Sequence, residues 1–203
     1  MTARTSHVLL VLSAFLAGLV IFLGAHSVRI YADDWRARTI ARMGPNGWKA
    51  VYSLVSIAGF VLIVWGFAQA RQTAGVLYAP PVFMRHITGL LVLGSFVLLA
   101  AAKVPGNHIK AAVGHPMVAG VKLWAFAHLL ANGRVADVVL FGAFLAWAIV
   151  DFIVSRKRDR AAGTRYPAGR GARTAMTVVI GVAAWVVFAF WAHQWLFGVA
   201  PFA

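Results

Sequence analysis

Apolar residues along the chain form six blocks, separated by short polar stretches. The blocks cover residues 8–27, 51–70, 83–102, 115–131, 135–154 and 174–197. Each is close to the roughly 20 residues that an α-helix needs to cross the hydrocarbon core of a bilayer. Because only a helix satisfies its own backbone polar groups there, the pattern predicts an all-α polytopic integral membrane protein. We expect about six transmembrane helices in one bundle.

The connections between the blocks indicate how the helices follow one another. The fourth and fifth blocks are separated by little more than "NGR", which predicts a tight antiparallel helical hairpin. The longest connection, residues 155–174, is basic and rich in Gly and Ala, and it is predicted to be mobile. The fourth block is the shortest and most polar, so we expect it inside the bundle. No separate soluble domain is visible, and residues 1–203 are predicted to form a single transmembrane domain.

Composition supports this class and removes several kinds of chemistry. Hydrophobic residues make up 62% of the chain and the mean hydropathy is +0.81, more apolar than a soluble domain of this size can bury. The chain has no cysteine, which excludes disulfides, thiolate metal ligands and cysteine nucleophiles. Its five acidic residues are all aspartates, which leaves few carboxylates for catalysis by a carboxylate pair.

The net charge of +14 is distributed unevenly between the two sides of the predicted membrane. Lys and Arg number 14 in the first, third and fifth connections, against 4 on the opposite side. The positive-inside rule then places the basic side in the cytoplasm and both termini in the periplasm. The charge therefore indicates contact with anionic membrane lipid, not nucleic acid. A cleaved signal peptide over residues 1–27 is an alternative, which would leave five helices.

Histidines near the ends of the apolar blocks are the first candidates for chemistry, because ionisable groups within a bilayer are costly. His26, His115 and His128 are the three hardest to explain by structure alone. His115 and His128 are 13 residues apart, about 20 Å along a helix, so they cannot ligate one metal together. Pro116 suits the first turn of a helix, whose positive end would keep the His115 imidazole neutral, as a metal or heme requires.

The remaining polar residues have simpler interpretations. His86 and His193 are predicted to be interfacial anchors, and His108 to lie in a solvated loop. Lys122 is expected to make a polar contact within the bundle. Asp151 is expected to pair with one of the arginines that follow it.

Several motifs together resemble the NnrU family of bacterial membrane proteins. They are "FLGAHSVRI", "VYSLVSIAGFVLIVWGF", "RHI", "IKAAVGHPMVAGVKLWAFAHLLANG" and "FLAWAIVD", and they span nearly the whole chain. The resemblance implies an inner-membrane protein associated with denitrification, in nitrite and nitric oxide reduction.

NnrU proteins in turn are similar to the plant zeta-carotene isomerase, a membrane enzyme that contains heme b. By motif, the two axial ligands of that enzyme fall on His26 and His128, which the resemblance implies are ligands of a heme iron. The cysteine of the enzyme's "WCxAH" motif is Ala125 here, so its redox role does not carry over. Depth along the helices favours His115 as the partner of His26, and this alternative stays open. Arg29 is a candidate partner for heme propionates.

Two further hypotheses accompany heme binding. The chain could isomerise a small apolar polyene in a heme-dependent reaction, or act without catalysis as a membrane assembly or scaffold factor whose polar residues join helices. "HPxxxG" also resembles part of the "RHPxxxG" motif of membrane methyltransferases. Gly114 replaces the arginine of that motif and no later acidic pair follows, which argues against methyl transfer. The sequence does not indicate which protein partners bind.

Overall fold

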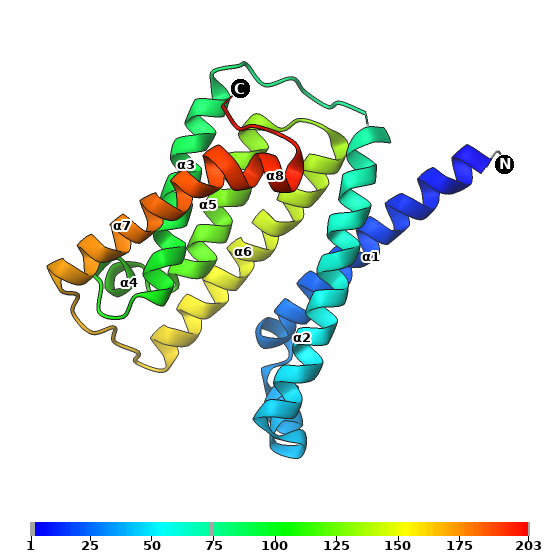
Figure 1. Ribbon diagram of the computed structural model, residues 1–203. Coiled ribbons are helices and arrows are strands. Elements are labelled where there is room, and N and C mark those ends of the chain that lie inside the picture. Colours follow the sequence, from blue (N-terminus) through cyan, green and yellow to red (C-terminus); the bar gives the residue numbers. More distant parts are fainter. Residues whose placement is uncertain (1–2, 74, 203) are drawn as a thin grey trace. The chain divides into compact units, whose positions relative to one another are not determined.

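The computed structural model describes residues 3–73 and 75–202, and most of them belong to helices (Figure 1). The helices are α1 (Ala3–Tyr31), α2 (Asp33–Thr73), α3 (Met84–Lys103), α4 (His108–Val113), α5 (Pro116–Ala131), α6 (Val135–Ala161), α7 (Gly171–Val187), the π-helical turn η1 (Phe188–Ala192) and α8 (His193–Phe197). Within the described residues, five helical stretches are long and apolar enough to span a membrane, and α5 is a shorter apolar helix. The prediction of an all-α polytopic membrane protein is thereby confirmed.

The chain divides into two compact units, which we describe separately. Unit 1 comprises Met1–Leu77 and Arg134–Ala143, and unit 2 comprises Tyr78–Gly133 and Phe144–Ala203. The prediction of a single domain over residues 1–203 is not tested by this division, because both units can belong to one membrane domain.

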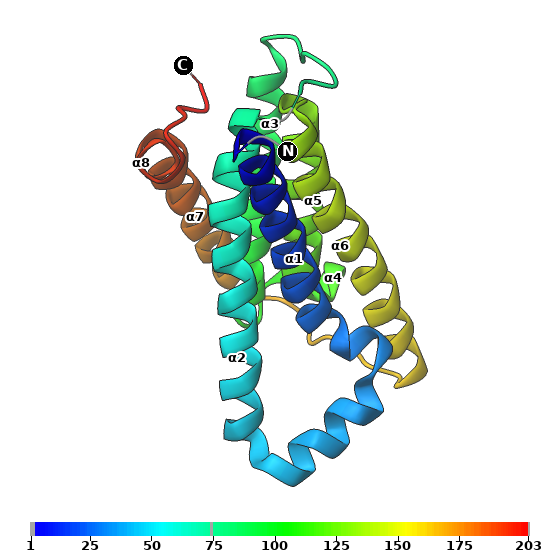
Figure 2. The ribbon, with the colours of Figure 1, turned by 90° about the vertical axis from the view of Figure 1, so that its right-hand side faces the viewer.

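Unit 1 is dominated by the pairing of α1 with α2 (Figure 2). The two helices approach closely where glycines replace side chains: a Cβ on Gly18 would lie 2.7 Å from the Ile63 nitrogen, and one on Gly66 would lie 2.7 Å from Phe15. Small residues that bring backbones together are typical of helix pairs in membranes, where lipid removes most of the hydrophobic drive for association.

The basic connection after the first apolar block is itself helical and forms the start of α2. A break at Gly44, with φ 76° and ψ 161°, separates this part from the membrane-length part of the helix. Glycine tolerates a positive φ that side chains disfavour, and Pro45 then occupies the first turn of the new segment. The pair Gly44-Pro45 therefore redirects the chain without a loop.

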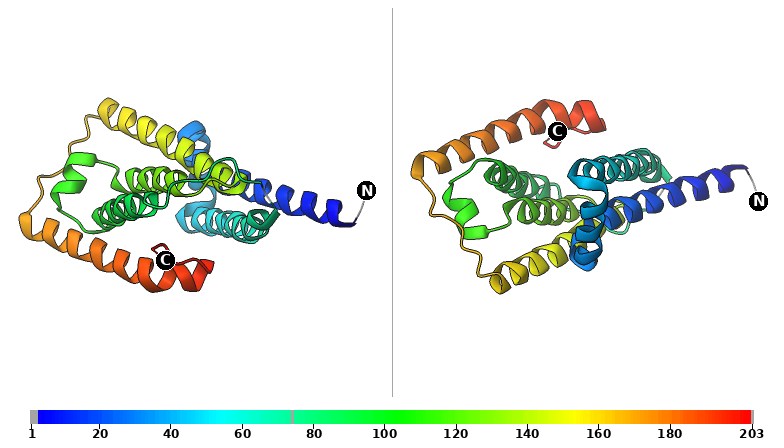
Figure 3. Two further views of the ribbon diagram at one scale, coloured as in Figure 1. Left: turned by 90° about the horizontal axis from the view of Figure 1, so that it is seen from above. Right: turned by 90° about the horizontal axis from the view of Figure 1, so that it is seen from below.

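In unit 2, α3 packs against both α5 and α7. Figure 3 shows α3 and α5 between α7 and the second half of α6. Two buried hydroxyls on α3 join it to α5: Thr88 donates to the Ala127 carbonyl at 2.9 Å and Ser95 to the Gly120 carbonyl at 2.8 Å. These bonds satisfy polar groups that would otherwise be costly in hydrocarbon.

The short helix α4 and the last connection close one end of unit 2. Asn107 caps α4: its Oδ1 accepts from the Lys110 amide at 2.7 Å, while its Nδ2 donates to the Ala101 carbonyl. Most of the segment 155–174, predicted as a mobile linker, is helical, because α6 extends to Ala161 and α7 begins at Gly171. The part between them is fixed where the Arg170 amide donates to the Gly106 carbonyl at 2.9 Å.

Large apolar side chains on the outer faces of the helices remain uncovered within the chain. Leu90 on α3 and Val179 on α7 are 68% and 65% exposed. Exposure of this kind over membrane-length helices is what contact with lipid requires, since acyl chains replace a protein partner.

Candidate functional site

A pocket of about 280 Å³ lies in unit 2. It is formed by α3, α5, the end of α7, η1, α8 and the last described residues of the chain. Its polar side chains include Arg85, His128, Asn132 and His193, and its rings are Trp124, Trp185, Phe188 and Phe202. An apolar pocket with a few convergent polar groups is the usual form of a small-molecule site.

His128 lies in the last turn of α5 and borders this pocket. Its Nδ1 donates to the Trp124 carbonyl at 2.9 Å, and the Trp124 ring packs on the imidazole with centroids 5.2 Å apart. Asn132 donates to the His128 carbonyl at 2.9 Å and so holds the end of the helix. When Nδ1 carries the proton of a neutral imidazole, the lone pair is on Nε2.

His193 also borders the pocket, although the sequence predicted only an interfacial anchor. It follows the π-helical turn η1, and its Nδ1 donates to the Val199 carbonyl at 2.7 Å. A π-helical turn inserts one residue into the helical repeat and is frequent at functional sites. The sequence "FAFWAHQW" carries no sign of this turn, and Arg85 was likewise missed because it begins α3 far away in sequence.

His26 lies in unit 1, near the end of α1. Its Nδ1 donates to the Phe22 carbonyl at 2.7 Å, and the Phe22 ring stacks on it with centroids 4.2 Å apart. Tyr52 packs on the imidazole at 5.4 Å. His26 and His128 thus share one local arrangement: an aromatic residue one turn earlier supplies both the carbonyl for Nδ1 and a ring against the imidazole.

The structure shows which predicted site residues share a unit and a pocket. His128 shares its pocket with His193 and Arg85, whereas His115 lies at the opposite end of α5. His26 and Arg29 belong to unit 1, so their pairing with the groups of unit 2 stays a prediction. In the described part of the chain, no three His, Cys, Asp or Glu side chains are grouped to hold a metal ion.

His115 belongs to a second polar cluster, with Asp159 and Tyr166. Its Nε2 lies 2.8 Å from Asp159 Oδ2, and the Tyr166 hydroxyl donates to the same oxygen at 2.6 Å. Arg156 adds a positive charge beside the carboxylate. The cluster fixes the connection between α6 and α7 to the start of α5.

Two other predicted polar contacts can now be placed. Lys122 lies over the Phe152 ring, with its Nζ 4.4 Å from the centroid, a cation–π contact within unit 2. Asp151 accepts a hydrogen bond from the Ser155 hydroxyl at 3.1 Å, and Arg158 donates to that hydroxyl. Ser155 thus joins Asp151 to Arg158, one of the arginines that follow it in sequence.

The Tyr166 hydroxyl makes the cluster sensitive to high pH. Burial, followed by its bond to Asp159, raises the pKa of Tyr166 from 10 to about 12. The unfolded chain then releases this proton at lower pH than the folded chain, so stability falls as pH rises from 10 to 12. We expect thermal unfolding scans to show a smaller decline over this window in Tyr166→Phe than in the native protein. Equal declines would contradict the role of this hydroxyl.

Membrane-length helices around a histidine-lined apolar pocket define a multi-pass helical membrane protein with a candidate ligand site. The chain belongs to the NnrU family: a family model described as "NnrU protein" matches residues 14–201. No curated protein and no solved structure gives a significant match. The resemblance noted from the motifs is thus confirmed at the level of the family.

Proposed function

We propose that this protein binds heme b in the bacterial inner membrane and serves nitrogen-oxide respiration. The proposed iron-ligating histidines are His128, which borders the pocket of unit 2, and His26, in unit 1. The observation that carries the proposal is the arrangement shared by the two imidazoles. Each donates Nδ1–H to a carbonyl one turn earlier and each packs against an aromatic ring.

The chemistry of these donors suits iron. Ligating histidines usually donate their second ring N–H to a carbonyl or carboxylate, which fixes the tautomer and makes the coordinating nitrogen more basic. Imidazole is a common protein ligand of heme iron, and bound heme would supply one-electron chemistry at that iron. Arg85 borders the same pocket as His128 and is the cation suited to heme propionates there. Arg29, in the last turn of α1, is the candidate cation near His26 in unit 1.

The orientation proposed from the charges gives the pocket a side of the membrane. Arg85 and His128 lie at the less basic ends of their helices, and the Arg-rich connection 155–174 lies at the other end of unit 2. By the positive-inside rule the pocket then faces the periplasm. This is the side where nitrogen oxides arriving from outside would first meet the protein.

An absorption spectrum of the detergent-purified protein tests the proposal. We expect a Soret band that shifts on reduction, and its loss or marked change in His26→Ala and in His128→Ala, because each removes one proposed ligand. His108→Ala is the matched control, since this histidine contacts Thr174 outside the pocket. His115→Ala tests the rival ligand.

Protein yield and helix content of each variant separate a ligand role from a structural one. A native spectrum in both His26→Ala and His128→Ala, or no Soret band in the native protein, would refute heme ligation. Normal yield with an altered spectrum would favour a cofactor site over an assembly or scaffold role.

A further inference from the structure

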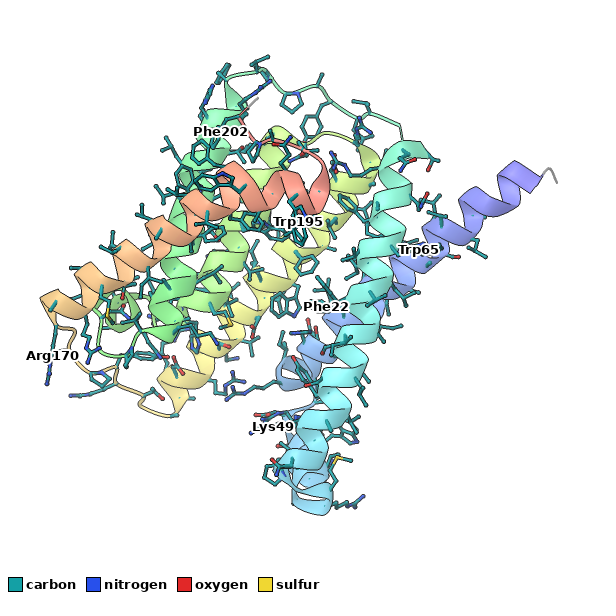
Figure 4. All side chains as sticks on the ribbon, viewed as in Figure 1. Phe22, Lys49, Trp65, Arg170, Trp195 and Phe202 are labelled. Atoms are coloured by element: carbon teal, nitrogen blue, oxygen red, sulfur yellow. The ribbon has the colours of Figure 1, made fainter. Side chains whose placement is uncertain are left out.

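The last described residues of the chain turn back onto unit 2. Helix α8 ends at Phe197. Its C-cap residue Gly198 has a φ of 70°, which allows the reversal, and residues 199–202 then line the pocket. We call residues 198–202 the C-terminal tail. The hydrogen bond from His193 to the Val199 carbonyl joins this tail to α8. In Figure 4, Phe202 lies at the end of the tail beside α3, while Trp195 extends from α8.

Phe202 occupies a position shaped for a flat ring. A Cβ on Gly89 would lie 2.6 Å from two atoms of the Phe202 ring, so only glycine lets the ring lie against α3 there. The His86 ring is stacked almost parallel to it, at 6.0 Å and 10°. Trp185 and Phe190 contact it at centroid distances of 6.1 Å and 5.6 Å. The three side chains that contact the ring, together with the absence of a side chain at Gly89, therefore form a position that fits a planar ring.

The tail is weakly constrained compared with the helices around it. Residues 199–202 are not part of a helix, and Pro201 has no N–H to donate. Much of what holds the tail in place is thus the apolar burial of the Phe202 ring. Such a segment can detach from the pocket at a much lower free-energy cost than the unfolding of a helix requires.

The charge and the size of the pocket indicate which kind of ligand would require the tail to move. Among the described residues, its lining contains Arg85 and two histidines but no carboxylate, which favours an acidic ligand. Its volume of about 280 Å³ is just below the roughly 300–1,000 Å³ of pockets for drug-sized ligands. A large flat ligand therefore needs the space that the tail fills.

We propose that the C-terminal tail is a lid on the His128 pocket. In the closed state, the Phe202 ring occupies the position that a planar ring of the ligand takes when the lid is open. The lid must withdraw before an acidic planar molecule reaches His128. For heme b this inference rests on the proposed function, whereas the lid itself does not depend on iron.

Cysteine accessibility tests the lid directly, because the native chain contains no cysteine. Ala131→Cys places one thiol in the pocket lining, and its reaction with a small water-soluble methanethiosulfonate reports how often the lid opens. Adding Phe202→Ala is expected to raise the labelling rate by about tenfold, since it removes most of the ring burial that closes the lid. Phe202→Tyr, which keeps the ring, should label as slowly as the native tail.

Gly89→Ala is a second variant that is expected to open the lid, because it displaces the Phe202 ring from the α3 side. It also tests whether faster labelling in Phe202→Ala comes only from a folding defect. The three atoms nearest to the added methyl group all belong to the Phe202 ring, and alanine is a better helix former than glycine. Gly94→Ala is the control on the same helix, because its Cβ would meet the flexible end of Leu123 at 3.2 Å. We expect fast labelling in Gly89→Ala and slow labelling in Gly94→Ala. Trp195→Ala, which removes an exposed ring of α8, should also label slowly.

Protoporphyrin IX without iron tests the planar ligand separately from heme ligation. It is expected to slow the labelling of the thiol introduced by Ala131→Cys in the Phe202→Ala background, and equally when His128 is also replaced by alanine. A labelling rate that does not change in Phe202→Ala and Gly89→Ala would overturn the lid, and no protection by the porphyrin would overturn the planar ligand. If the native protein shows no Soret band while these labelling results hold, heme ligation fails and the lid stands.

Discussion

Replacing Arg71 with leucine is expected to destabilise unit 1 by about 3 kcal/mol, the lower end of the cost of breaking a buried ion pair. Arg71 Nε lies 3.3 Å from Asp137 Oδ1, and the Asp137 side chain is only 3% exposed. The variant leaves this carboxylate buried without its main counter-ion. Arg134 lies nearby and still offsets part of the negative charge of Asp137, which is why we choose the lower figure.

The double variant Arg71→Leu/Asp137→Leu distinguishes a buried charge from lost packing. Exchanging both partners of a buried pair for apolar groups is often neutral, whereas removing one partner is costly. We therefore expect thermal unfolding of the detergent-purified double variant to return close to that of the native protein. If the double variant is only as stable as Arg71→Leu alone, the loss comes from a contact that both variants lack, such as that of Arg71 with the Phe67 ring.

The second large effect is expected at the contact of α1 with α2. Gly18→Ala places a methyl group 2.7 Å from the Ile63 nitrogen and 2.9 Å from the Leu62 carbonyl carbon. Backbone atoms cannot move aside as a flexible side chain can, so the helices must separate. Overpacking of this kind costs about 1–3 kcal/mol.

Gly24→Ala is the matched control on the same helix. Apart from its chain neighbours and the adjacent backbone of α1 itself, no described atom lies within 4 Å of a Cβ at Gly24, and alanine there improves helix propensity. We expect Gly24→Ala to be neutral or slightly stabilising in the same unfolding assay, while Gly18→Ala lowers the transition. Equal effects of the two substitutions would show that glycine flexibility, not close approach, matters in α1.

Much of the helical architecture follows from apolar block length. The blocks at residues 83–102 and 115–131 correspond almost residue for residue to α3 and α5, because Pro80-Pro81 and Pro116 mark their starts. The helical start of α2 and the short helix α4 were not predicted. Both lie in polar connections, where apolar periodicity gives no signal and local capping decides.

The candidate site was predictable only in part. Two signals in the sequence pointed to His128: a costly imidazole in an apolar block and the family motif around it. His193 and Arg85 belong to the same pocket but come from elements separated from α5 by many residues. Their meeting depends on the π-helical turn and on the return of the C-terminal tail, neither of which has a local sequence pattern.

The sequence by itself determined that this chain is a multi-pass helical membrane protein of the NnrU family, because block length and hydrophobicity act residue by residue along the chain. Only the tertiary structure decided which ionisable groups lie together: His115 with Asp159 and Tyr166, Arg71 with Asp137, and His128 with His193 around one pocket. The physical reason is that a buried polar group is stabilised by whatever polar or charged partner the packing brings close to it. That partner can lie anywhere in the sequence.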